Sequence, residues 1–177
     1  MNNLNRSNSA VYKLVIISLI AAIYTVVSLL GASLSFSNIQ VRFAEVLCLL
    51  PILFPWAIWG VTLGCFLTNL LGVVFTVNTL GIIDIVFGTL ATFIAAYLTY
   101  RWRNIRFGNW PVLSALAPVV VNGIVIGLEL ALVFGNGDFS LFVLFALEVA
   151  AGELIACVLI GLPVIRQLER TGLFKQV

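Results

Sequence analysis

Long apolar stretches separated by short polar or glycine-containing segments set the pattern of this chain. We expect helices over residues 11–31, 42–54, 55–77, 82–100, 111–134 and 139–165. A helix that crosses a bilayer needs about 20 predominantly apolar residues. The stretch 42–54 is shorter, rises only about 20 Å as an α-helix, is interrupted by Pro51 and is followed directly by Pro55. Whether this second helix crosses on its own therefore stays open.

The composition places these helices in a membrane. Hydrophobic residues make up 62% of the 177 residues and charged residues 9%, against about 45–50% and about 25% in soluble domains. Arg6 and Lys13 precede an apolar run that is too long for a cleaved signal, so we interpret it as the first helix. We predict an all-α integral membrane protein, a compact bundle of six transmembrane helices in a single membrane domain, residues 1–177.

The basic residues predict the orientation. Eight of the nine flank the first helix, fill the segment after the fourth, or follow the sixth: Arg6, Lys13, Arg101, Arg103, Arg106, Arg166, Arg170 and Lys175. With six crossings these positions share one side, and Lys and Arg mark the cytoplasmic side. We therefore expect a multi-pass protein of the cell membrane with both termini in the cytoplasm.

Catalytic and metal chemistry have few candidate residues. The chain has no histidine, which removes the commonest general base and metal ligand. Neither an HExxH nor a GxSxG motif is present. The cysteines Cys48, Cys65 and Cys157 lie in apolar runs and are interpreted as buried residues. We expect no catalytic residue, no metal, no cofactor and no nucleic-acid partner.

Polar residues inside the apolar stretches are the candidate binding site, because ionisable groups in a bilayer are costly. These candidates are Arg42, Glu45, Asn69, Asp84, Asn122, Glu129, Glu148 and Glu153. Most of the acids fall in the outward half, on four helices, which predicts a polar pocket open to the outside. Glu129 and Glu148 are the strongest candidates, because neither has a basic residue in its own helix. An acid-rich pocket favours a ligand with hydrogen-bond donors or a positive charge.

Structural roles stay open for the other candidates. Arg42 and Glu45, three residues apart at the outer end of the second helix, fit a surface ion pair. Asp84 fits a helix cap, and Asn69 fits an interhelical hydrogen bond. Glu153 fits a neutral, hydrogen-bonded acid of the packed interior.

Small residues recur in the first helix at a spacing of four. Ser18 and Ala22 form one pair, and Ala21 and Thr25 the other. Such pairs let a second helix approach closely. The partner is either another helix of this chain or another subunit.

Several segments resemble the QueT family. They are the small-residue pattern at 18–25, VRFAEVLCLLP at 41–51, GVTLGCFLTNLLG at 60–72, DIVFGTLATFIAA at 84–96 and ELIA at 153–156. Together they cover nearly the whole chain.

The resemblance implies an S-component, the substrate-binding subunit of an energy-coupling factor (ECF) importer. Such a subunit has six helices and does not hydrolyse ATP itself. Two ATPase subunits, which are joined to it through a membrane coupling subunit, hydrolyse the ATP. The first helix usually docks through an AxxxA motif, in which Ser18 here replaces the first alanine. The whole S-component is thought to topple in the membrane and release its substrate inward.

The ligand that the resemblance implies is a 7-deazaguanine precursor of queuosine. Glu148 or Glu129 would accept from the base edge, and Asp84 or Glu45 would pair with an aminomethyl group. Asn122 could donate and accept beside them. Two alternatives are an S-component for another vitamin and a small proton-coupled secondary transporter.

Overall fold

The computed structural model describes residues 10–31 and 43–172, and this part of the chain is helical without strands. Its elements are α2 (Ala10–Leu30), the 3-10 helix η1 (Phe43–Ile52), α4 (Ala57–Val74), α5 (Ile82–Arg101), α6 (Val112–Phe134), α7 (Phe139–Glu153), the π-helical segment η2 (Leu154–Gly161) and α8 (Leu162–Thr171). The described chain is therefore an all-helical bundle.

Five helical stretches are long and apolar enough to cross a membrane. They are α2, α4, α5, α6 and the continuous helix Phe139–Thr171 formed by α7, η2 and α8. The shortest, α4, has 18 residues and rises about 27 Å, close to the hydrocarbon thickness of about 30 Å. The chain is a multi-pass helical membrane protein.

The second predicted helix differs most from the expectation. Over 42–54 we expected an α-helix, whereas the described part, Phe43–Ile52, is a 3-10 helix of 10 residues. At about 2.0 Å per residue it rises about 20 Å, so this segment does not reach across the hydrocarbon. The break that the prolines predicted lies between Ile52 and Ala57.

The other boundaries differ by a few residues. The helix expected over 55–77 begins at Ala57 and ends at Val74, and the one expected over 139–165 continues to Thr171. Pro111 is the residue before α6 rather than its first residue.

The long helices form a series in which each packs against the next, and η1 lies inside it. The largest interfaces join α2 with α4, α4 with α5, α5 with α6, and α6 with α7. The short helix η1 contacts α2, α4, α5, α6, η2 and α8. Its residues Ala44, Glu45, Cys48 and Leu49 are almost fully buried. η1 is therefore the central element of the bundle.

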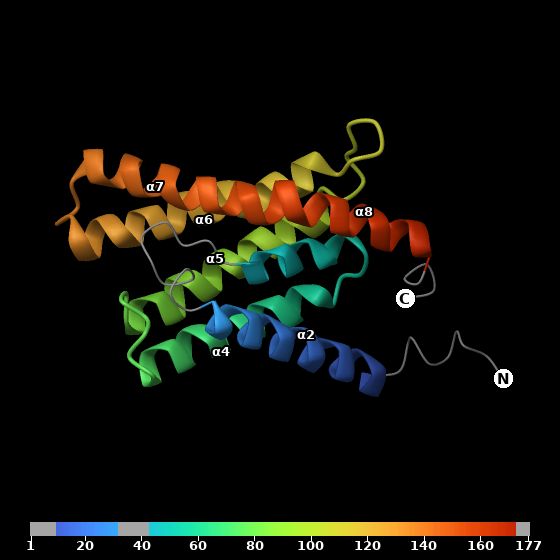
Figure 1. Ribbon diagram of the computed structural model, residues 1–177, viewed down its shortest axis with the longest axis horizontal. Helices are drawn as coiled ribbons and strands as arrows, with labels where there is room; N and C mark the ends of the chain where they lie inside the picture. Colours follow the sequence, from blue (N-terminus) through green and yellow to red (C-terminus); the bar gives the residue numbers. More distant parts are fainter. Residues whose placement is uncertain (1–9, 32–42, 173–177) are drawn as a thin grey trace.

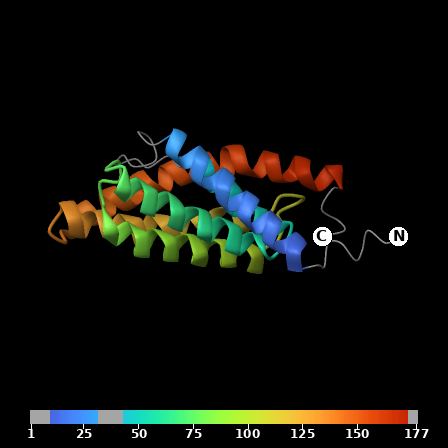
Figure 2. The ribbon, with the colours of Figure 1, turned by 90° about the horizontal axis from the view of Figure 1, so that it is seen from below.

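Both views of the ribbon show the same arrangement of helix ends and connections (Figures 1 and 2). The start of α2, the connection between α5 and α6, and the end of α8 lie at one end of the bundle. The connections from α4 to α5 and from α6 to α7 lie at the other end, called here the α6–α7 end. Helix α2 runs toward the α6–α7 end, α4 starts at the opposite end, and η1 lies before α4 in the chain.

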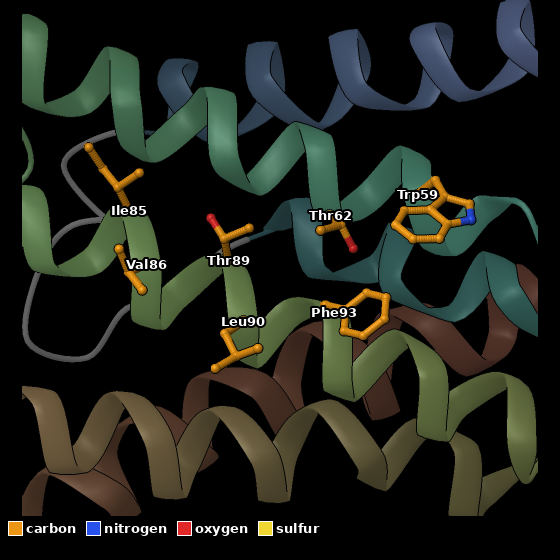
Figure 3. A pocket seen from close by; sticks show the side chains of 7 residues that line it. All are labelled: Trp59, Thr62, Ile85, Val86, Thr89, Leu90 and Phe93. Carbon is orange, nitrogen blue, oxygen red and sulfur yellow. The ribbon is translucent and has the colours of Figure 1, made fainter.

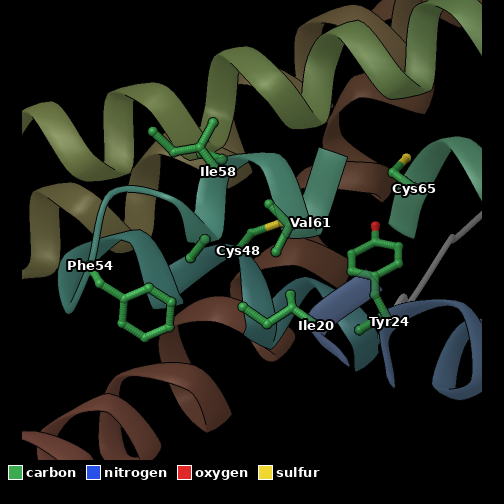
Figure 4. Close-up of a cluster of buried hydrophobic side chains, with 10 residues drawn as sticks. Ile20, Tyr24, Cys48, Phe54, Ile58, Val61 and Cys65 are labelled. Carbon is green, nitrogen blue, oxygen red and sulfur yellow. The ribbon is translucent and has the colours of Figure 1, made fainter. Parts of the chain in front are cut away.

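Three apolar clusters fill the interior. Figure 4 shows the first, in which Ile20 and Tyr24 of α2 meet Cys48 of η1 and Val61 and Cys65 of α4. A second cluster joins α5, α6 and α7, and a third joins η1 with α6, η2 and α8. Many large apolar side chains also lie exposed on the outside, as expected of a surface solvated by lipid.

Helices α6 and α7 pack closely because Gly127 has no side chain. A Cβ at this position would lie 2.6 Å from the Cα of Ala146 on α7. At Gly123, one turn away, a Cβ would lie 3.3 Å from its nearest neighbours, so that position has more room.

We expect Gly127→Ala to destabilise the protein and Gly123→Ala to be close to neutral. Both substitutions gain about the same helix propensity, but only the first forces α7 backbone away, at a cost of about 1–3 kcal/mol. Thermal unfolding of the detergent-solubilised variants measures the difference. Equal stability of the two variants would show that the α6–α7 distance is not fixed at Gly127.

Candidate ligand site

Six of the polar residues predicted for the site are buried inside the bundle. They are Glu45, Asn69, Asp84, Asn122, Glu129 and Glu153, each no more than 4% exposed, while Glu148 is half-buried. Acids are rarely this buried unless they are paired. Arg42, also predicted for the site, lies outside the described residues.

A chain of contacts, called here the central network, joins five of the elements. The Tyr24 hydroxyl of α2 donates to Oε1 of Glu45 on η1. The Sγ of Cys157 on η2 lies 3.4 Å from the carbonyl oxygen of Glu45 and 3.5 Å from Oε2 of Glu153, and its single S–H donates to one of them at a time. Asn122 Nδ2 of α6 donates to Glu153 Oε1 at 2.7 Å. The central network thus holds two buried carboxylates together.

The central network lies near the middle of the bundle. Counted along their helices from the α6–α7 end, Asn122 lies about 18 Å from Phe134 and Glu153 about 21 Å from Phe139. Glu45 is in the first turn of η1, the end of the helix that we predicted from the sequence, but this end lies at the depth of the central network rather than at the outer end of the bundle. The reason is that η1 begins inside the bundle, where Glu45 meets Tyr24 and Cys157.

Glu129 and Glu148 lie between the central network and the α6–α7 end. Glu129 is seven residues after Asn122 on the same buried face of α6, which places it about 10 Å closer to that end. Glu148 lies about 14 Å from the start of α7. It points away from Glu153, because five residues turn a helix by about 140°.

Three buried oxygen atoms of these residues have no hydrogen-bond donor among the described residues. They are Glu45 Oε2, Asn122 Oδ1 and Glu148 Oε2. All three are acceptors when the carboxylates are ionised. A buried acceptor without a donor costs about 1–3 kcal/mol, so this interior favours a ligand that brings several N–H or O–H groups.

Asp84 and Asn69 belong to a separate polar cluster at the connection between α4 and α5. Asn78 Nδ2 donates to Asp84 Oδ2 at 2.9 Å, and Asn69 Nδ2 donates to the Asp84 carbonyl oxygen at 2.8 Å. Asn78 Oδ1 also accepts from the backbone N–H of Leu80. The cap position of α5 is Gly81, so these bonds favour a role for Asp84 in holding the connection over a role as helix cap.

The two pairs of small residues in α2 face different surroundings. Ala21 and Thr25 are buried, and the Thr25 hydroxyl lies 2.9 Å from the Ala21 carbonyl oxygen and 3.2 Å from that of Gly64 on α4. Ser18 and Ala22 lie exposed on the outside. The first pair serves the contact between α2 and α4, and the second pair remains on the surface.

The described basic residues belong to segments at the end of the bundle opposite to Glu129. The described ones are Lys13, Arg101, Arg103, Arg106, Arg166 and Arg170. Arg106 forms a two-pronged ion pair with Glu169, with N–O distances of 2.6 and 2.9 Å. These hydrogen bonds raise the pKa of the Arg106 guanidinium.

Sequence reasoning missed three residues that hold the polar interior together: Tyr24, Asn78 and Cys157. Tyr24 shares the buried face of α2 with Ala21 and Thr25, and this spacing was the available signal. Cys157 was interpreted as an inert buried residue, although its thiol bridges Glu45 and Glu153.

These features define a class of protein: a multi-pass helical membrane protein with a buried acidic interior and a basic rim at one end. The family model of the QueT transporter matches residues 14–170. The chain therefore belongs to the QueT transporter family, which is a family of transporters and not of enzymes. No curated protein and no solved structure matches the chain significantly.

We expect Tyr24→Phe to destabilise the protein, because it removes the donor from a buried carboxylate. The expected loss is about 1–3 kcal/mol. Tyr97→Phe is the matched control, since Tyr97 is 50% exposed on α5 and its loss should change stability by less than about 0.5 kcal/mol. Equilibrium unfolding in mixed micelles measures both. Equal stability of Y24F and Y97F would show that Glu45 does not depend on this bond.

Proposed function

We propose that this transporter-family chain is the S-component of an ECF importer and that it captures a 7-deazaguanine precursor of queuosine from outside the cell. The observation that carries the proposal is the set of buried acceptors Glu45 Oε2, Asn122 Oδ1 and Glu148 Oε2, which lack donors among the described residues. A substrate of an importer must bind reversibly, and hydrogen bonds to such atoms give affinity without covalent chemistry.

A 7-deazaguanine base has the complementary groups. Its guanine-like edge presents a ring N–H beside an exocyclic amino group, and one carboxylate can accept both as charge-assisted bonds. We assign this edge to Glu148 or Glu129, which lie between the α6–α7 end and the central network along their helices. Asn122 Oδ1 can accept a further N–H.

The aminomethyl group of 7-aminomethyl-7-deazaguanine is a cation and requires a second carboxylate. Glu45 suits this role, since Oε1 accepts from Tyr24 while Oε2 has no described donor. Asp84 is the other candidate. Its carboxylate already accepts from Asn78, so pairing with the ligand would compete with the connection between α4 and α5.

The direction of capture follows from the charges. Because Lys and Arg mark the cytoplasmic side, the end that holds the start of α2 and the end of α8 faces the cytoplasm, and the α6–α7 end faces outward. Helices α2 and α4 both run toward the α6–α7 end, which supports a further pass between them and six passes in all. Substrate then reaches Glu129 and Glu148 from outside.

The exposed pair Ser18 and Ala22 is the proposed docking face for the membrane coupling subunit. Two small residues one turn apart on an exposed helix face allow close approach of another helix. Ala21 and Thr25 lie on the buried face of α2 and hold this helix against α4. Two ATPase subunits, bound through the coupling subunit, would energise transport.

Isothermal titration of the purified chain with 7-aminomethyl-7-deazaguanine tests the proposed substrate, with guanine and riboflavin as controls. We expect one-to-one binding of the deazaguanine, with much weaker binding of the controls. Preferred binding of riboflavin would instead indicate an S-component for another vitamin. Uptake into vesicles that needs a proton gradient and no ATPase subunits would indicate a secondary transporter.

Single substitutions of the acids test the assignment of the base edge. We expect Glu148→Gln and Glu129→Gln to weaken deazaguanine binding by about 10- to 150-fold for the residue that contacts the ligand, which corresponds to about 1.5–3 kcal/mol. Glu169→Gln is the control, because Glu169 pairs with Arg106 at the opposite end. Unchanged affinity in both E129Q and E148Q would remove these residues from the site.

Larger residues on α2 test the docking face. We expect Ser18→Leu and Ala22→Leu to abolish co-purification with the coupling subunit while leaving the ligand Kd unchanged, because both side chains point away from the interior. Val120→Leu on the exposed face of α6 is the control. Assembly of all three variants at the wild-type level would place the coupling subunit elsewhere.

A further inference from the structure

An apolar groove lies between α4 and α5, away from the interior acids. Figure 3 shows the side chains that line it, among them Trp59 and Thr62 of α4 and Val86, Leu90 and Phe93 of α5. Its volume is about 480 Å³. None of the acids of the central network lines it.

A second hollow continues this groove toward the basic end of the bundle. It has a volume of about 430 Å³ and shares Trp59 and Phe93 with the first. Trp56, just before α4, and Tyr97 of α5 also line it. Along α5 the joined groove extends from Ile85 to Tyr97, or about 18 Å. This is about the depth of one leaflet of hydrocarbon.

Two cations border the basic end of the groove. The Nζ of Lys13 lies 4.8 Å from the ring centroid of Trp56. Arg101 is exposed and follows Tyr97 by four residues, so it lies one turn further along the same face of α5. One cation is thus contributed by the first turns of α2 and the other by the last turn of α5.

We propose that this groove binds one anionic phospholipid, with an acyl chain along α4 and α5 and the phosphate between Lys13 and Arg101. The apolar walls match an acyl chain, and the charges match a phosphate at the level where headgroups lie. Tryptophan and tyrosine at the groove's basic end are the side chains enriched at this interface. A helix of a partner protein would use the apolar walls but would not need a cation on either side. The proposal depends on membrane insertion alone and not on the identity of the transported substrate.

Bromine-labelled lipids test the proposal through tryptophan fluorescence. The chain has four tryptophans, and the double variant Trp102→Phe, Trp110→Phe keeps only Trp56 and Trp59, which both line the groove. In detergent micelles we titrate it with phosphatidylglycerol that carries bromine on one acyl chain, and separately with brominated phosphatidylcholine. Since each basic residue near the surface contributes about 1 kcal/mol, we expect phosphatidylglycerol to quench at an about 30-fold lower concentration.

Charge variants in the same background locate the headgroup. We expect Lys13→Gln and Arg101→Gln each to raise the concentration needed for quenching by phosphatidylglycerol about 5-fold. Arg170→Gln removes a charge from the same end without bordering the groove and should change nothing. Circular dichroism and gel filtration confirm that the variants are folded.

Three results would overturn the proposal. Equal quenching by the two lipids would show that no anionic headgroup is bound. Quenching by phosphatidylglycerol that is unaffected by K13Q and R101Q would place the headgroup elsewhere. If a stoichiometric amount of the purified coupling subunit prevents quenching of Trp56 and Trp59 in the variant that keeps Lys13 and Arg101, a partner helix is the occupant.

Discussion

The hydrogen bonding of Glu45 is the constraint on which the arrangement of the bundle depends. A carboxylate near the middle of a bilayer has no bulk water to solvate it, so its partners must come from the protein or from a ligand. Tyr24 supplies a donor from α2, and the thiol of Cys157 approaches the Glu45 backbone from η2. These contacts hold η1 between the outer helices, although η1 is too short to cross the membrane.

The non-α geometry of η1 and η2 fits this arrangement. A long 3-10 helix and a π-helical segment are both uncommon, and π-helical turns occur frequently at functional sites. Here they pack against one another, with Leu49 of η1 directly against Gly161 of η2, where a Cβ would lie 2.7 Å from the leucine. The π-helical segment follows Glu153 immediately and contains Cys157, so the widened helix lies where the second carboxylate joins the central network.

Much of the fold could be predicted from the sequence, because apolar length and the position of basic residues are direct consequences of the bilayer. The long helices begin and end within a few residues of the expected positions, with the largest difference at the end of α8. The depth of η1 could not be predicted in this way, since an apolar run of 10 residues fits several positions along a bundle. Glu45 is in the first turn of its helix, as expected, but that turn lies deeper in the bundle than we expected.

The candidate site, like the fold, could be predicted from the sequence only in part. Asn122, Glu129 and Glu153 were recognised from their place in apolar helices, and all three are buried in the structure. Their partners depend on the register between helices, which a single helix does not encode. The bridging role of Cys157 required the positions of η1 and α7, and the bond of Asp84 to Asn78 required the path of the connection.

Some buried acceptor oxygens have a hydrogen-bond donor within the protein and others do not. This difference would let a polar interior be stable and still bind a ligand selectively. One oxygen of Glu45 is already bonded to Tyr24, so a ligand that uses the other oxygen need not break the contact that holds η1. In the proposed binding mode, selectivity would come from the acceptors that remain, since a ligand that leaves one of them without a donor forgoes about 1–3 kcal/mol. A flavin ring presents carbonyl acceptors on both sides of its one ring N–H and would place acceptor against acceptor. The guanine-like edge of the proposed substrate instead presents adjacent donors to these acceptors.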